Sequence, residues 1–412
     1  MRVTEKEISN RTCFAVRGSV LPTAIAATTV ITIAMLGLIV LWEQSRMAEL
    51  GYRRLRQAHA DAESAYMLYC LHPDDERLTA AEGFLLYDSI PRSRVYLSVR
   101  PWGLYELVGI STSDSAVRQC RITGIAPVAE RTLYYADNRT ALNIAGDTRL
   151  RGTLYLPRNG LVYGRMGTEF FDGEPVPTAS VRLSAAEMPH PEPKSAEILR
   201  RLLARADRTT NGVPDSAEIP LSADSTLFLA VGSAEIADCS LSGRIVITGD
   251  EVRIDSTCRM RTVIVCARKA TIGSGTHIEA QILARDTAIM EPRAALRYPS
   301  GIYAGRYAEL GDSVTLDGYA IVRDTTGDRR ATASYRQSPT ARLRGLLYVD
   351  GTAEVRGHVT GFACLRAAAY FSPQGYYKDM LYDVDLRENP VTAHPVWIAD
   401  SVARRKEVVC TN

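Results

Sequence analysis

The sequence predicts a mainly β protein: a single-pass N-terminal transmembrane helix extended into a long α-helix, a small antiparallel sheet, then a parallel β-helix. Two observations carry this prediction. Residues 18–42 contain no Asp, Glu, Lys or Arg, and residues 234–324 repeat short β-rich stretches. An aliphatic row in that repeat recurs every 19 residues, at Ile245, Ile264, Leu283, Ile302 and Ile321. Strands this short cannot bury an apolar row alone, so coils of ~19 residues would stack and share a core.

The composition of the 412-residue chain allows buried cores and argues against several classes of protein. Hydrophobic residues make up 46% of the chain, which is too many for a disordered protein. The net charge of +2 gives no electrostatic reason to expect nucleic acid as a partner. The 8 cysteines show neither a C-x-x-C motif nor zinc spacing, so we expect no metal site and no cofactor.

The N-terminal region reads as a membrane anchor. Residues 1–17 form a short basic leader, and residues 18–42 would make a helix roughly 36 Å long, enough to cross a bilayer. A cleaved signal peptide and a buried soluble helix are the alternatives, but the apolar stretch is long for a signal peptide. Cationic residues balance on the two sides, and long C-terminal domains translocate regardless of charge. We therefore expect a cytoplasmic leader, contact with membrane lipid, and the bulk of the chain outside the cytoplasm, in the periplasm or at the cell surface.

Residues 43–72 are expected to continue the helix as a stalk, which ends at His72-Pro73. A seam of small and apolar residues follows the helical period, at Leu55, Ala58, Ala62, Ala65 and Tyr69. Alanine permits close approach of a second helix, so the seam is our candidate surface for self-association or for envelope assembly proteins. Packing of the seam on the chain's own sheet is the alternative.

The leader and helix together resemble a known family. A basic leader ending Arg17-Gly18, an uncharged helix starting Ser19-Val20-Leu21-Pro22 and an amphipathic extension resemble the N-terminal segment of type IV pilin-like proteins and pseudopilins. In that family a membrane peptidase cuts the leader after the glycine, and the helix packs into a filament core. The resemblance makes Gly18 and Ser19 the candidate processing site. Thr23 stands where pilins usually carry Glu, so a processed and an intact leader both stay open.

The rest of the chain divides by its residue pattern. Residues 73–139 alternate as an antiparallel β region with a turn at Pro101-Trp102-Gly103, and residues 140–185 read as the first β-helix coils. A proline-rich linker and an amphipathic helix occupy residues 186–222, and the main β-helix runs over residues 223–366. Residues 367–412 are expected to cap the last coil, because tyrosines cluster at their start.

Two further resemblances concern the repeat. In coil length and in its dominance by Ile, Val and Leu it resembles bactofilins, polymer-forming β-helical scaffolds of bacterial cells. Residues 270–278 and 308–316 resemble the hexapeptide repeats of left-handed β-helix acyltransferases, so the handedness stays open.

Catalytic candidates in the repeat have simpler explanations. The acyltransferase resemblance nominates His277 as a general base, and Glu279, Arg285 and Asp286 could form the charged cluster of a β-helix polysaccharide lyase. A turn histidine and charges on the solvent faces of strands account for the same residues without chemistry. We therefore predict no catalytic residue and no enzyme.

The pair Cys239 and Cys258 lies 19 residues apart, one predicted coil. Stacked strands are ~4.8 Å apart, which is within the Cα separation of a disulfide. Side chains in register point in parallel, which disfavours the disulfide torsion. The pair is thus predicted to be stacked cysteines or a disulfide.

The sequence as a whole favours a membrane-anchored, non-enzymatic structural or assembly component of the bacterial cell envelope, pilin-like with a β-helical scaffold. A surface adhesin or glycan-binding β-helix is the alternative. A β-helix enzyme, an acyltransferase or a polysaccharide lyase, is the third possibility.

Overall fold

A computed structural model of the chain describes residues 20–88, 90, 93–113, 115–127, 131–205, 212–324, 333–389, 391–399 and 404–411. The leader of residues 1–17 and the processing positions Gly18 and Ser19 lie outside the described residues. The chain divides into two compact units, residues 1–60 and 61–412. The fold is mainly β, with one long N-terminal helix and a domain of parallel strands.

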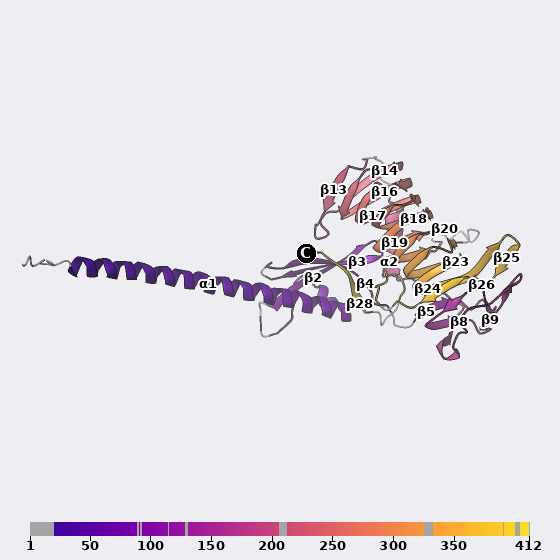
Figure 1. Cartoon of the computed structure of the whole chain (residues 1–412), viewed down its shortest axis with the longest axis horizontal. Helices are drawn as coiled ribbons and strands as arrows, with labels where there is room; N and C mark the ends of the chain where they lie inside the picture. Colours follow the sequence, from indigo (N-terminus) through magenta and orange to yellow (C-terminus); the bar gives the residue numbers. More distant parts are fainter. Residues whose placement is uncertain are drawn as a thin grey trace, which may run out of the picture. The chain divides into compact units, whose positions relative to one another are not determined.

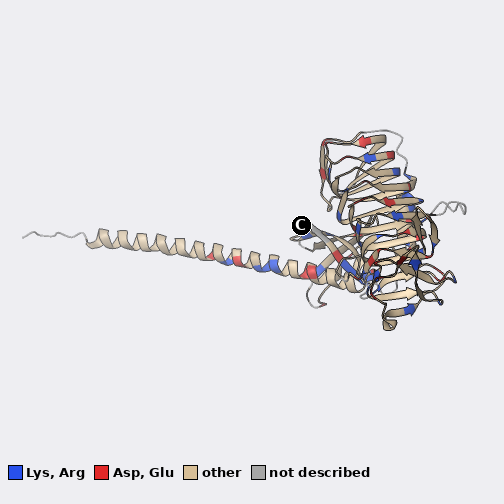
Figure 2. Ribbon diagram, turned by 45° about the vertical axis from the view of Figure 1, so that its right-hand side comes forward, with Lys and Arg blue, Asp and Glu red and all other residues tan. Residues whose placement is uncertain are grey.

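Helix α1 (Val20–Leu71) runs without interruption for 52 residues. Its apolar part has a mean hydropathy of 2.5 and is exposed, so α1 is long and apolar enough to cross a membrane. The Thr23 and Thr28 hydroxyls donate to helix carbonyls at 3.0 Å, which satisfies them without water. Figure 2 shows that the N-terminal stretch of α1 carries no charged residue; the first is Glu43. The predicted apolar N-terminal helix is confirmed.

In the second unit, the last turns of α1 and the 3₁₀ helix η1 (Glu76–Thr79) are followed by an antiparallel sheet. Its strand order is β1-β2-β3-β4-β28, with β1 (Phe84–Leu85), β2 (Arg94–Trp102), β3 (Tyr105–Thr112), β4 (Arg118–Ile125) and β28 (Arg405–Thr411). The last turns of α1 pack on one face of this sheet, where Ala62 and Ala65 are fully buried and Tyr69 is 2% exposed. This half of the alanine seam therefore packs on the chain's own sheet.

The parallel-strand domain fills most of the second unit. Its strands are β5 (Arg131–Tyr135), β6 (Leu142–Ala145), β7 (Arg149–Leu150), β8 (Thr153–Leu156), β9 (Leu161–Tyr163), β12 (Val181–Leu183), β13 (Ser216–Ile219), β14 (Leu227–Ile236), β15 (Ser240–Gly243), β16 (Ile245–Ile254), β17 (Arg259–Ile272), β18 (His277–Met290), β19 (Ala295–Ala304), β20 (Tyr307–Leu310), β21 (Thr315–Val322), β22 (Ser334–Gln337), β23 (Arg342–Glu354), β24 (Gly357–Ser372), β26 (Met380–Tyr382) and β27 (Val384–Arg387). Antiparallel hairpins β10 (Arg165–Met166) with β11 (Glu169–Phe170), and β24 with β25 (Gly375–Lys378), project from it. Two helical elements belong to the same region, the 3₁₀ helix η3 (Thr178–Ser180) and α2 (Pro193–Ala204).

The stacking order of these strands differs from their order in the sequence. Strand β24 pairs in parallel with β5, which pairs with β8 and through it with β12. The coils of residues 131–183 therefore lie beyond those of residues 216–372, as the neighbouring magenta and yellow strands of Figure 1 show. An open edge pairs with any strand that matches it, so sequence order does not determine stacking order.

Residues 367–412 do not cap the last coil as expected. Strand β27 pairs with β24 on one side and with β7 on the other, so it lies between late and early coils. The chain then returns to the antiparallel sheet, where β28 pairs with β4. Tyr377 and Tyr382 instead pack on Tyr370 of β24; the Tyr370 and Tyr382 ring centroids are 4.6 Å apart.

The aliphatic row of the repeat does not form one column, so the predicted register was wrong. The observed column runs along neighbouring coils through Ile247, Val265, Ile282, Ile302, Ala320, Leu347 and Ala363, with a step that varies. Ile245 and Ile302 face the core inside the coils, whereas Leu283 and Ile321 face a second cluster outside them. Strand side chains alternate between faces, so a step that changes by one residue moves a side chain to the other face.

The second cluster joins the sheet to the parallel-strand domain. Trp102, at the tip of the β2–β3 hairpin, donates its indole N–H to the carbonyl of Thr262 at 3.0 Å. The Gln281 side chain donates to the Trp102 carbonyl at 2.9 Å and accepts from the Leu104 N–H at 2.8 Å. Trp397, from the returning C-terminal segment, is fully buried in the same cluster. The sheet and the parallel strands thus share one apolar interface.

Candidate functional site

Ion pairs to a buried arginine attach the end of α1 to the antiparallel sheet. The side chain of Arg121 on β4 is 5% exposed, and it donates to Glu63 of α1 at 3.1 Å and to Glu407 of β28 at 2.9 Å. Its guanidinium also lies 4.5 Å from the centre of the Tyr66 ring. Because Arg121 contacts both the helix and the last strand, loss of either carboxylate would weaken both attachments.

A second set of contacts joins the same three elements. Arg405 of β28 donates to Glu106 of β3 at 2.8 and 3.0 Å, and Tyr69 of α1 donates to the same carboxylate at 2.8 Å. Burial, and then the Glu106 charge, raises the pKa of Tyr69 far above its ordinary value, so this phenol stays a donor. We call the two sets together the helix clasp: Glu63, Tyr69, Glu106, Arg121, Arg405 and Glu407. No local sequence pattern indicates the helix clasp, because its paired residues are up to 299 positions apart.

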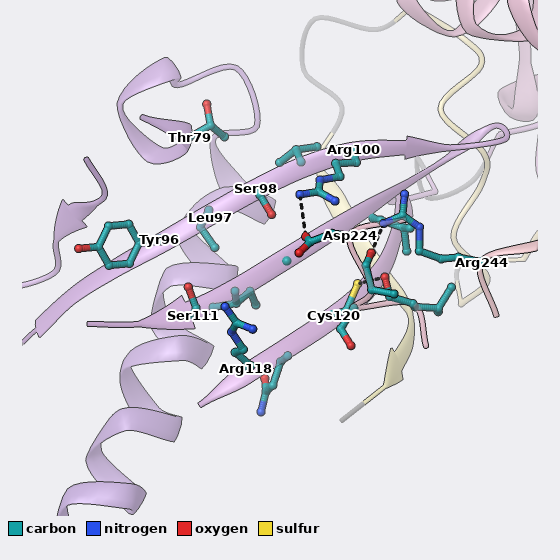
Figure 3. Close-up of a pocket in the computed structure, with 18 of the residues that line it drawn as sticks. Thr79, Tyr96, Leu97, Ser98, Arg100, Ser111, Arg118, Cys120, Asp224 and Arg244 are labelled. Atoms are coloured by element: carbon teal, nitrogen blue, oxygen red, sulfur yellow. Dashed lines mark hydrogen bonds and ion pairs between the residues drawn. The ribbon is translucent and has the colours of Figure 1, made fainter. Parts of the chain in front are cut away.

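The opposite face of the sheet forms a groove of about 740 Å³, the sheet groove. Side chains alternate between faces along β3: Glu106 meets α1, whereas Leu107 and Gly109 line the groove. The parallel-strand domain contributes Arg244 and the segment 221–224 to its wall. Figure 3 shows side chains from both parts around one hollow.

The sheet groove carries three guanidinium groups and one carboxylate. Arg100 lies 3.5 Å from Asp224, and Arg118 comes from β4 at the far side of the groove (Figure 3). Arg244 donates to Thr226 at 2.9 Å and to the Ala223 carbonyl, while its Nε has no hydrogen-bond partner among the residues described. Burial lowers the pKa of Arg244. The three guanidinium groups can bind an anionic group in the sheet groove. No local sequence pattern predicts this groove, because its residues come from distant segments.

The structure brings together only part of the predicted charged cluster. His277 and Glu279 line a groove of about 770 Å³ with Arg259, Arg261 and Arg297, which we call the coil groove. Arg285 lines a different cavity, and Asp286 lies 3.9 Å from Arg268. Burial raises the pKa of Glu279, with Arg261 and Arg297 opposing the rise.

The two cysteines lie on neighbouring coils as thiols. The sulfur atoms of Cys239 and Cys258 are 3.4 Å apart, and both side chains are buried. The Cys258 thiol also donates to the carbonyl of Ile236 at 3.0 Å. Within the described ranges, no group of three or more His, Cys, Asp or Glu side chains is arranged to hold a metal ion.

Comparison with known proteins gives no relative: no family model, no curated protein and no solved structure matches the chain.

Proposed function

We propose that the protein is a membrane-anchored, non-enzymatic structural or assembly component of the bacterial cell envelope. The helix clasp is the observation that carries the proposal. A helix long enough to cross a membrane ends on an antiparallel sheet, where ion pairs built on the buried Arg121 and the contacts of strand β28 hold it. A load on the anchor would pass through the clasp to the sheet, and through Trp102 and Gln281 to the parallel strands.

The same arrangement supports a pilin-like identity for the N-terminal part. An apolar helix that continues into a helical stalk, and whose end packs on a small antiparallel sheet, is the layout that the pilin-like resemblance implies. In this proposal the leader is cytoplasmic and both β regions lie outside the cytoplasm. Processing between Gly18 and Ser19 remains part of the proposal.

The parallel-strand domain would serve as the scaffold. We propose that its stacked coils form a β-helix with a repeat of ~19 residues on average, as in the bactofilin-like comparison. Fully buried aliphatic residues on coil after coil support a rigid, continuous core. A domain with such a core favours a structural role over a catalytic role that needs flexibility.

Self-association is proposed to use the N-terminal end of the seam, at Leu55. Leu55 is 43% exposed, whereas Ala62 and Ala65 are covered by the sheet. We expect Leu55→Cys to form a disulfide-linked dimer when membranes of the host are treated with a mild oxidant. The six cysteines whose side chains the structure describes are buried, and the parent chain treated in the same way gives the background from the other cysteines. The measurement is a non-reducing gel with immunodetection.

Arg53→Cys provides the matched control, because Arg53 lies two residues away and so on the opposite side of α1. Its side chain is exposed like that of Leu55. A dimer from Leu55→Cys and none from Arg53→Cys supports packing through the seam. Equal cross-linking of both variants, or of neither, contradicts it.

A further inference from the structure

Charged side chains follow the coils in two rows on one solvent-facing side of the parallel-strand domain. Strand pairing sets Ser242, Arg261 and Glu279 side by side on successive coils, and Arg297 occupies the next coil. The neighbouring row contains Ser240 and Arg259, with His277 on the next coil. Successive coils are ~4.8 Å apart, so the rows run along the stack and offer charges at a regular spacing.

The arginines of the coil groove form no ion pair with the described residues, although the Glu279 charge lies near Arg261 and Arg297. Farther along the rows, Arg344 pairs with Asp317 at 2.6 Å and Arg387 pairs with Asp385 at 2.6 Å. By contrast, the described part of the chain provides no ion pair or side-chain hydrogen bond for Arg259, Arg261 and Arg297, and all three are exposed. Guanidinium groups bind carboxylates and sulfates through paired N–H donors. The groove therefore offers several free donors for anions.

Glu279 lies among these arginines, and one of its two carboxylate oxygens lacks a hydrogen-bond donor. It is partly buried, and its Oε1 atom is shielded from water without a hydrogen-bond partner in the described residues. The carboxylate also accepts a backbone hydrogen bond from Thr262, which lowers the pKa of Glu279 against the effect of burial. Thr262 has φ of 58°, and its carbonyl accepts from Trp102. A shielded oxygen atom without a donor destabilises the folded protein. A ligand hydroxyl that donates to this atom would remove the penalty.

We propose that the coil groove binds an acidic polysaccharide, with its anionic groups on Arg259, Arg261 and Arg297 and a sugar hydroxyl donating to Glu279. A linear polymer would lie along the stack and contact neighbouring coils in turn. The requirement for both anions and hydroxyls favours a chain of uronic acids over a simple polyanion. This binding depends on neither the anchor nor the assembly role proposed above.

A nucleic acid fits the groove less well. The described residues that line the groove include no Phe, Tyr or Trp on which bases could stack. Glu279 would also repel a continuous row of phosphates, and the chain as a whole carries a net charge of only +2.

The test uses the full chain in detergent micelles, with polygalacturonate, neutral pullulan and single-stranded DNA as probes in a binding titration. We expect polygalacturonate to bind and pullulan not to bind. The double variant Arg261→Gln/Arg297→Gln should lose at least ~10-fold in affinity, because two charge-assisted contacts disappear. The control Arg285→Gln/Arg306→Gln removes the same charge at exposed positions outside the groove and should bind like the parent. Thermal melting establishes that both variants are folded.

The role of Glu279 separates a polysaccharide site from a general polyanion site. Glu279→Ala should weaken binding of polygalacturonate but strengthen binding of polyphosphate, which has no sugar hydroxyl and is repelled by the carboxylate. Three results would overturn the proposal: no binding of polygalacturonate by the parent chain, equal loss in the control variant, or preferential binding of DNA in the groove. A gain for both polymers in Glu279→Ala would also overturn it.

Discussion

Leu283→Asp is expected to unfold the parallel-strand domain. Leu283 is fully buried, and its strand neighbours are Cys266 and Tyr303 on the adjoining coils, which offer no cation to a carboxylate. Burial of an unpaired carboxylate, together with the lost apolar packing, should cost more than about 4 kcal/mol. Far-UV circular dichroism and limited proteolysis of the purified protein measure the loss.

Arg285→Asp is the matched control for this variant. It introduces the same side chain on the same strand at an exposed position. Its free energy of unfolding should lie within about 0.5 kcal/mol of that of the parent. A Leu283→Asp protein that melts with the control would show that Leu283 is not buried in a packed cluster.

Trp397→Ala is expected to detach the returning C-terminal segment from the parallel-strand domain. The Trp397 ring is fully buried, with its centroid 6.1 Å from that of Tyr303 and 6.0 Å from that of Tyr348. Truncating a buried tryptophan to alanine typically costs about 3–5 kcal/mol. Because β28 follows this segment, hydrogen exchange should also rise in β4, its partner strand.

Two further variants make the Trp397 result specific. Trp397→Phe keeps an aromatic ring in the cluster and removes an indole N–H that has no partner among the described residues, so it should lose much less stability. Val391→Ala, in the same segment but 71% exposed, should have little effect. Equal destabilisation by all three variants would contradict the proposed attachment.

The fold class could be predicted because it depends on local patterns. An uncharged stretch long enough for a bilayer predicts the helix, and short β-rich stretches with turns between them predict stacked parallel strands. Both features are present in the structure. Neither requires knowledge of which distant residues meet.

The register could not be predicted from the spacing of aliphatic residues. Gly318, Gly345 and Gly361 pair with one another on successive coils, although they are unevenly spaced in the sequence. A Cβ atom on Gly345 would lie 1.9 Å from the Gly318 carbonyl oxygen, and its φ is +133°, so only glycine fits. These glycines mark the true step better than the isoleucines, because insertions between coils change the spacing but not the close approach of the backbones.

The helix clasp and the two grooves lay beyond sequence reasoning for a different reason. Arg121 and Glu407 are 286 residues apart, and nothing near either one indicates the other. The sheet groove likewise combines Arg100 and Arg118 with Arg244 from the other domain. His277 and Glu279 were recognised as candidates, but their arginine neighbours come from coils whose register was needed to place them.

The most direct test of the membrane-anchored account is the side of the membrane on which the parallel-strand domain lies. Gln374, in the exposed β24–β25 hairpin, is suited to Gln374→Cys, and the parent chain with its buried described cysteines gives the background. Intact host cells are treated with a small charged maleimide that reaches the periplasm but does not cross the cytoplasmic membrane, with a cytoplasmic thiol protein as the control for the integrity of that membrane. The account predicts labelling of Gln374→Cys in intact cells. Labelling only after the cells are permeabilised would place the domain in the cytoplasm and contradict the account.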